Sequence, residues 1–118
     1  MKMKAKPNKN KFHAVRCEFD GITFDSLKEM RFYASLKQQM MLSVEEFRVI
    51  DIQRQVRYDI AVAGKKIAYY KLDFLVTYGN GTKRYFDVKG VKKGCAYQLF
   101  KLKKKIVQAI YGIEIEEV

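Results

Sequence analysis

The stretch that decides the fold runs from residue 65 to residue 89 and reads KKIAYYKLDFLVTYGNGTKRYFDVK. It contains two runs rich in aromatic and β-branched residues, over 66–78 and 83–89, joined by Gly79-Asn80-Gly81. A short, glycine-rich connection of this kind is typical of a β-hairpin with a three-residue loop, in which Gly81 takes the left-handed backbone conformation. We therefore predict two antiparallel strands in which Tyr78 faces Thr82, so that the numbers of facing residues sum to 160.

This register sorts the side chains of the hairpin onto two faces. Leu72, Phe74 and Val76 share one largely apolar face, because side chains alternate along a strand. On the other face Asp73 falls directly opposite Asp87. Like charges that face each other across a ladder cost about 0.2–1 kcal/mol. We therefore expect a cation between these two acids.

Lys89 lies two residues beyond Asp87 and is expected on the same face. A hard divalent ion such as Mg²⁺ binds one or two carboxylates together with water and phosphate oxygens, and a lysine beside it could orient water or meet developing negative charge. The alternative is that the two acids form surface ion pairs with Lys71, Arg84 or Lys89.

Outward from this hairpin the chain has the pattern of an α+β (α/β) domain with a central mixed sheet flanked by helices. We expect residues 1–13 to be a flexible basic arm and residues 14–118 a single domain. The predicted elements are a hairpin over 15–24 around Asp20-Gly21, a helix from Leu27 to about Leu42, an interrupted strand over 47–58, the hairpin described above, a helix over 95–111 that stops at Gly112, and an end strand over 113–118. After the first hairpin the order is α-β-β-β-α-β.

The charge of the chain is large and unevenly distributed. Lysine and arginine total 24 against 13 acids, a net charge of +11, with +6 over residues 1–16 and +10 over residues 65–105. Two concentrated basic blocks indicate a polyanionic partner, most commonly a nucleic acid.

Composition also excludes several classes of protein. One histidine and two cysteines give no zinc site, disulfide framework or histidine-based catalysis, and nothing indicates an organic cofactor. The chain has no apolar run long enough to cross a membrane and no secretory signal. We expect a cytoplasmic protein with reduced thiols.

Glu29 is placed unusually on the first predicted helix. A helical wheel puts it in the apolar arc, between Leu36 and Met40, on the side that packs against the sheet. A carboxylate there is costly unless something compensates it. The alternative is a capping box with Ser26, which has the right spacing.

The second predicted helix carries two stripes. Its apolar stripe is expected to be buried and consists of Ala96, Leu99, Leu102, Ile106, Ala109 and Ile110. Its polar stripe consists of Gln98, Lys101, Lys105 and Gln108, and is either a solvated face or a ridge that follows phosphates. Before this helix, Gly90 and Gly94 flank Lys92 and Lys93 and would let backbone approach a nucleic acid closely.

These residues together resemble the PD-(D/E)xK nuclease superfamily. The matching features are Glu29 on the first helix, Leu72-Asp73 on one strand and Asp87-Val88-Lys89 on the next, within the α-β-β-β-α-β order. The resemblance spans roughly residues 15–118 and is closest to small phage-encoded members similar to Holliday-junction resolvases. Leu72 stands where the superfamily name has proline.

The resemblance implies a restriction-endonuclease-like core and Mg²⁺-dependent cleavage of DNA, with Mn²⁺ as a substitute, on branched or junction DNA in phage recombination, replication or packaging. It implies that Asp73 is the central metal ligand and that Asp87 is a second ligand, with the Val88 carbonyl beside it. Lys89 would position the attacking water, and Glu29 would ligate the metal or orient water. Gln98 loosely matches a glutamine that some branches carry, and a homodimer is suggested by analogy alone.

Two other functions explain part of the pattern. A non-catalytic nucleic-acid-binding module would account for the charge, the arm and the aromatic residues, but not for the opposed Asp73 and Asp87. A small phage adaptor or inhibitor with a nuclease fold and no activity would account for the fold.

Overall fold

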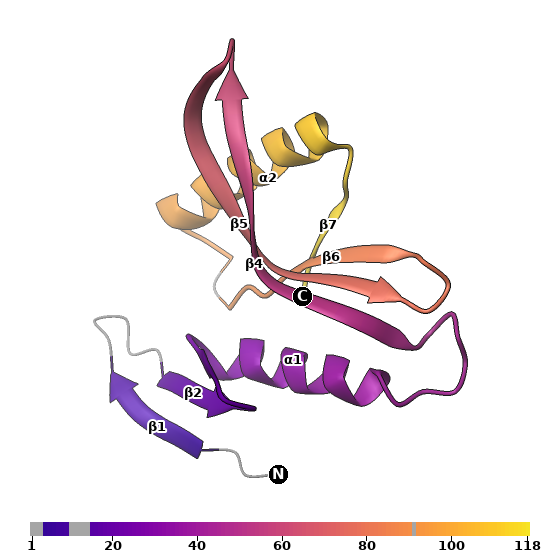
Figure 1. Cartoon of the computed structure of the whole chain (residues 1–118). Coiled ribbons are helices and arrows are strands. Elements are labelled where there is room, and N and C mark those ends of the chain that lie inside the picture. Colours follow the sequence, from indigo (N-terminus) through magenta and orange to yellow (C-terminus); the bar gives the residue numbers. More distant parts are fainter. Residues whose placement is uncertain (1–3, 10–14, 91) are drawn as a thin grey trace.

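A computed structural model describes residues 4–9, 15–90 and 92–118 of the chain. It shows an α+β protein with two sheets and two helices (Figure 1). In chain order the elements are β1 (Lys4–Lys9), β2 (Val15–Phe19), β3 (Ile22–Phe24), α1 (Leu27–Gln39), β4 (Val49–Val62), β5 (Lys65–Tyr78), β6 (Lys83–Asp87), α2 (Cys95–Tyr111) and β7 (Ile115–Glu117). Within the described ranges neither helix is long and apolar enough to cross a membrane.

The larger sheet has the strand order β4-β5-β6-β7. Its first three strands are antiparallel neighbours, whereas β7 runs parallel to β6, so the predicted mixed sheet is confirmed. The register predicted for the hairpin is also confirmed, since Phe74 pairs with Phe86 and Val76 with Arg84. In its loop Gly81 has a φ of 87°, as the left-handed position requires.

The smaller sheet contains the predicted N-terminal hairpin and one strand more. β2 and β3 are joined by Asp20 and Gly21, whose φ values of 57° and 75° fit the mirror-image turn that suits a twisted hairpin. β1 pairs antiparallel with β2. Lys4–Lys9, within the flexible arm expected over residues 1–13, is thus paired as a strand, because the open edge of β2 offers unpaired backbone groups to that segment. The rest of the arm lies outside the described residues.

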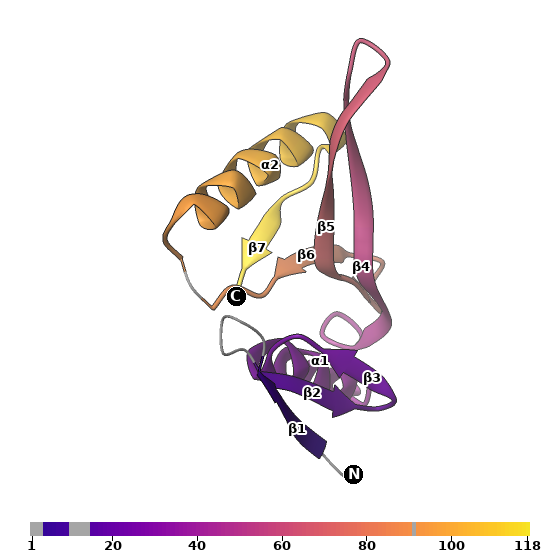
Figure 2. The ribbon, with the colours of Figure 1, turned by 90° about the vertical axis from the view of Figure 1, so that its left-hand side faces the viewer.

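Helix α1 lies between the two sheets (Figure 2). Its inner side chains, among them Met30 and Leu36, share one apolar core with Phe24 of the small sheet and with Phe74 and Phe86 of the large one. The N-terminal hairpin is thus tied to the main sheet through α1.

A second core forms on α2. The two-stranded ribbon of β4 and β5 packs on α1 with one face along part of its length and on α2 along the rest. Phe74 and Val76 pack in the α1 core, whereas Leu72 and Tyr70 pack with Val107 of α2. The even-numbered residues of β5 therefore face α2 before Asp73 and α1 after it. The prediction of one apolar face containing Leu72, Phe74 and Val76 is wrong for this reason.

The same switch occurs on the neighbouring strand. Ile52 belongs to the α1 core and Val56 to the α2 core, and between them Gln55 has a φ of 55°. The pairing continues across this point, since Arg54 pairs with Phe74 and Val56 with Leu72. Both strands thus bend together at Gln55 and Asp73, and above the bend the two-stranded ribbon rises away from β6 (Figure 1).

Helix α2 packs on the sheet through a different side from the predicted one. Val107 is fully buried and Phe100 partly buried, whereas Leu99, Leu102 and Ile110 are 53%, 56% and 50% exposed. The prediction of a buried stripe is therefore wrong for Leu99, Leu102 and Ile110. It is also wrong for Ala96 and Ala109, which are exposed, whereas Ile106 is partly buried against this core as predicted. The helix has apolar residues on two sides, and hydrophobic periodicity alone does not indicate which of them meets the sheet.

Gly79 should be the least replaceable glycine of the hairpin loop, although its backbone is not left-handed. A Cβ atom there would lie 2.6 Å from the carbonyl oxygen of Glu45 and 2.9 Å from its Cγ. We expect Gly79→Ala to lower the free energy of unfolding by about 1–3 kcal/mol, measured by urea denaturation, because the backbone must shift. Gly90→Ala is the matched control and should be close to neutral, since nothing lies within 4 Å of its added Cβ. Equal stability of the two variants would contradict the packing described for Gly79.

Candidate active site

Asp73 and Asp87 are brought together as predicted, and the carboxylate of each accepts a hydrogen bond from the backbone of the other's strand. The Asp73 amide donates to Oδ1 of Asp87 at 3.1 Å, and the Val88 amide donates to Oδ2 of Asp73 at 2.9 Å. Side-chain acceptors thus continue the strand pairing at the point where the ribbon bends. This reciprocal arrangement fixes both carboxylates and leaves the second oxygen of each for another partner.

The second oxygen of Asp87 is the most unusual atom of the site. Asp87 is 1% exposed, and its Oδ2 is buried with no hydrogen-bond partner among the described residues. Burial raises the pKa of this carboxyl to about 6, against the opposing charge of Lys89. Burial likewise raises the pKa of Asp73. A buried carboxylate oxygen without a partner is costly unless it is protonated or bound to a cation.

Glu29 faces the same region from α1. Its backbone amide donates to Oγ of Ser26 at 3.1 Å, so the predicted cap forms. Its carboxylate turns to β4 instead, where Oε1 lies 3.4 Å from Nε2 of Gln55 and 3.8 Å from Nη2 of Arg54. Glu29 is 9% exposed, and burial, followed by the nearby charge of Asp73, raises its pKa to about 7.

Gln55 connects the two acids and was not predicted as a site residue. Its Nε2 donates to Glu29 and, also at 3.4 Å, to Oδ1 of Asp73. The left-handed backbone conformation costs a residue other than glycine about 1–2 kcal/mol, and such strain is concentrated at functional sites. The predicted interruption of this strand does not occur as a break, since β4 is continuous from Val49 to Val62. No feature of the sequence singled out Gln55.

Lys89 lies on the α2 side of the acids. Its charge acts to lower the pKa of both Asp73 and Asp87, and its Nζ lies 3.8 Å from the centroid of the Phe100 ring. The Lys89 carbonyl accepts a hydrogen bond from Nζ of Lys28 at 2.6 Å, which joins the start of α1 to the end of β6. The lysine is therefore held between the acid pair and the helix that follows.

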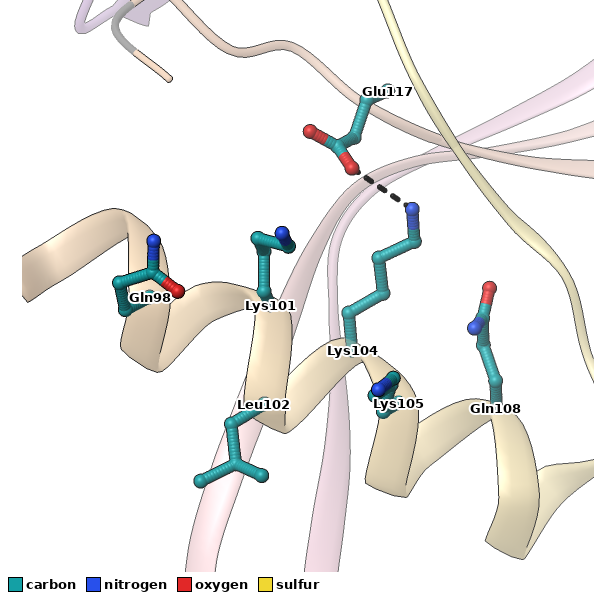
Figure 3. Close-up of a pocket in the computed structure, with 7 residues that line it drawn as sticks. All are labelled: Gln98, Lys101, Leu102, Lys104, Lys105, Gln108 and Glu117. Carbon is teal, nitrogen blue, oxygen red and sulfur yellow. Dashed lines mark hydrogen bonds and ion pairs between the residues drawn. The ribbon is translucent and has the colours of Figure 1, made fainter. Parts of the chain in front are cut away.

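A pocket of about 460 Å³, lined mainly by polar side chains, opens between α2 and β7 (Figure 3). Its lining residues are Gln98, Lys101, Leu102, Lys104, Lys105, Gln108 and Glu117. Glu117, which accepts from Nζ of Lys104 at 2.9 Å, is the ladder partner of Asp87 on the adjacent strand. Hence the pocket and the acid pair are neighbours across β6 and β7.

The predicted nucleic-acid-binding residues separate into two groups. Gln98, Lys101 and Lys105 line the pocket together, as the polar stripe indicated. Lys92 and Lys93 are exposed in the segment before α2 and are not among its lining residues. Lys104 was missed, because only the position of β7 shows that it points into the pocket.

The acids fit a divalent ion only in part. Among the described residues, no three Asp, Glu, His or Cys side chains are arranged to hold a metal ion together. The predicted set of three carboxylate ligands is thus not assembled, since the Gln55 amide stands between Glu29 and Asp73. Mg²⁺, however, commonly binds through one or two carboxylates and keeps several waters. Asp73 and Asp87 fit that smaller requirement, and the unpartnered Oδ2 of Asp87 is a suitable donor.

A comparison with protein families covers the residues of this site except Glu117. Residues 9–116 match the model of the family described as "Protein of unknown function (DUF1064)". The chain belongs to this family. The match includes Glu29, Gln55, the acid pair and the pocket lysines. No curated protein and no solved structure matched the chain.

The raised pKa of Glu29 predicts that folding stability falls as pH rises. Because the folded-state pKa is about 7 and the ordinary value is 4.5, the protonated form is favoured by folding. This contribution is complete below pH 4.5 and is lost as pH rises through 7. In EDTA, we expect Glu29→Gln to exceed the parent in free energy of unfolding at pH 8 by about 1–3 kcal/mol, and by much less at pH 4.5. Glu114→Gln, at an exposed acid, is the control and should follow the parent. A parent curve that rises from pH 5 to pH 8 would contradict the burial described for Glu29.

The left-handed backbone of Gln55 predicts that glycine stabilises the protein more than alanine at this position, the reverse of the order expected elsewhere in a strand. Gln55→Gly should be more stable than Gln55→Ala by about 1 kcal/mol, because only glycine adopts this φ without steric cost. At Gln53, an exposed position of the same strand outside the left-handed region, alanine should be the more stable of the two. Urea denaturation of the four variants measures both differences, and the same order at both positions would contradict the bend.

Proposed function

We propose that this protein is a Mg²⁺-dependent endonuclease that hydrolyses phosphodiester bonds in DNA. The observation that carries the proposal is the reciprocal Asp73–Asp87 pair, which leaves a buried carboxylate oxygen without a partner beside Lys89. A protein that only bound DNA would gain nothing from two buried acids within its most basic region. An enzyme needs them to hold a cation against the phosphate.

In this proposal Asp73 and Asp87 hold the metal, with the Val88 carbonyl beside them. The bound ion would lower the pKa of an attacking water and neutralise charge on the phosphate. Lys89 stabilises negative charge that develops on the phosphate or orients the water. Glu29 has a pKa of about 7, so it can hold or release a proton near neutral pH from its place beside Gln55.

The basic surroundings supply the affinity for DNA. Residues 65–105 carry a net charge of +10, and the lysines of the α2 pocket lie next to the ladder partner of Asp87. Contacts of this kind bind phosphates without reading bases, so they position the backbone over the acids. The α1-β4-β5-β6-α2-β7 order and the mixed sheet support a restriction-endonuclease-like assignment, from which we propose branched or junction DNA as the substrate.

The test is cleavage of labelled four-way-junction, flap, duplex and single-stranded DNA with Mg²⁺, Mn²⁺ or EDTA. We expect metal-dependent cutting that falls by at least about 100-fold in Asp87→Asn, since even removing a group that supports a metal ligand costs about 10–100-fold. The asparagine keeps an acceptor for the Asp73 amide, so the strand pairing should survive. DNA binding should be equal or tighter, because one negative charge is removed. Asp51→Asn, at an exposed acid of β4, is the control and should cut like the parent.

Two results would overturn the proposal. If Asp87→Asn cuts like the parent, the acid pair is not the active site. If the parent binds DNA without metal and cuts none of the four substrates, the protein is a nucleic-acid-binding module and the acid pair is structural.

A further inference from the structure

A second pocket, of about 350 Å³, lies between β5 and α2 and shares no lining residue with the pocket of Figure 3. Pockets that hold small organic groups usually measure about 300–1,000 Å³. We call this one the aromatic pocket. Its lining side chains include Tyr69, Tyr70 and Lys71 of β5 and Leu99, Phe100 and Lys103 of α2.

The aromatic pocket offers an exposed ring on which a planar group can stack. Tyr69 is 44% exposed, and its ring centroid lies 4.1 Å from Cζ of Arg57 and 5.8 Å from Nζ of Lys103. Next to it along β5, Tyr70 packs on Phe100 with ring centroids 6.0 Å apart. Exposed aromatic rings held beside cations are the surfaces on which proteins stack the bases of a single nucleic-acid strand.

Tyr70 adds a hydrogen-bonding group that the protein leaves unmatched. This residue is 4% exposed, and its hydroxyl is buried with no hydrogen-bond partner among the residues that the structure describes. A buried hydroxyl without a partner is costly, and a bound ligand is one way in which it is satisfied. The edges of a base carry both donors and acceptors that suit a hydroxyl.

The charge of the aromatic pocket favours an anionic ligand. No acid is among its lining residues within the described part of the chain. Lys71 and Lys103 form no ion pair with any acid in the same ranges. A planar ring joined to a phosphate would match both the aromatic side chains and the lysines, and this combination is the chemistry of a nucleotide.

The aromatic pocket adjoins the acid pair. Lys71 precedes Asp73 by two residues of β5, which is about 7 Å along a strand. From α2, the ring centroid of Phe100 lies 3.8 Å from Nζ of Lys89. A nucleic-acid strand with one base in the pocket would therefore have its nearby phosphates close to Asp73 and Lys89.

We propose that the aromatic pocket binds one unpaired base of the DNA strand that is cut at the acid pair. The base stacks on Tyr69, and Lys71 and Lys103 meet the phosphates on either side of it. A base within a duplex is paired and stacked on its neighbours, so it must leave the helix to enter a pocket. The place of the base beside the cut rests on the proposed nuclease function. The pocket then narrows the substrate to DNA with an unpaired stretch next to the cleaved bond, such as a flap or a fork, over continuous duplex.

Binding in EDTA tests the pocket without any cutting. The probes are a labelled duplex with a short thymine tail and the same duplex with a tail of abasic sugar phosphates, measured by fluorescence anisotropy. We expect the parent to bind the thymine tail about 5- to 100-fold more tightly, the range that stacking of a base on one ring supplies. In Tyr69→Leu the two affinities should agree within about 2-fold. Tyr69→Phe keeps the ring and should retain the preference.

Phe47→Leu is the matched control. Phe47 is 59% exposed in the segment before β4, so this variant also loses an exposed ring but should keep the preference of the parent. Tyr69→Leu should bind the abasic tail as the parent does, because its lysines and its fold are unchanged. Far-UV circular dichroism checks the fold.

Equal binding of both tails by the parent, or binding of neither at low salt, would overturn the inference. So would a Tyr69→Leu variant that keeps the preference. Displacement of the tailed DNA by thymidine monophosphate at a similar concentration would also overturn it, since the pocket would then be a site for a free nucleotide. A preference lost in Tyr69→Leu, in a protein that cuts no DNA with Mg²⁺, would support the base pocket and overturn the nuclease proposal alone. Metal-dependent cutting without the preference would do the reverse.

Discussion

The rest of the site depends on the reciprocal hydrogen bonds in which the carboxylates of Asp73 and Asp87 each accept from the backbone of the other's strand. These bonds occur where β4 and β5 bend, so the two carboxylates replace part of a regular ladder. On the side of the bend that holds Phe74 the ribbon packs on α1, and on the side that holds Leu72 it packs on α2. One bend therefore produces two separate cores, and it leaves the acids between them.

The buried acids are unfavourable for folding. Burial raises the pKa of Glu29, Asp73 and Asp87 alike, and Gln55 adopts a strained backbone to place its amide between two of them. A stable protein could replace these groups by apolar or neutral side chains. Natural proteins accept such local costs where a site must bind or react, and they compensate elsewhere through packed cores. The electrostatic cost of the cluster is one support for the proposed active site at the bend.

The side chains of helix α2 lie in three different environments. Phe100 and Val107 pack on the sheet, the lysines and glutamines line the pocket beside Asp87, and Leu99, Leu102 and Ala109 remain on the outside. The helix thus connects the packing of the sheet to the pocket beside Asp87.

The sequence by itself determined the elements and the pairing that bring Asp73 and Asp87 together. Hairpin chemistry and side-chain alternation are local, so the loop at Gly79-Asn80-Gly81 was enough to set the register. The place of Glu29 on the inner face of α1 followed from helical periodicity in the same way. Only the tertiary structure decided that the ribbon bends at Gln55, that Lys104 joins the pocket, and that the stripe through Leu102 is exposed. These features depend on which faces meet, and a chain with apolar residues on several faces does not encode that choice in any local pattern.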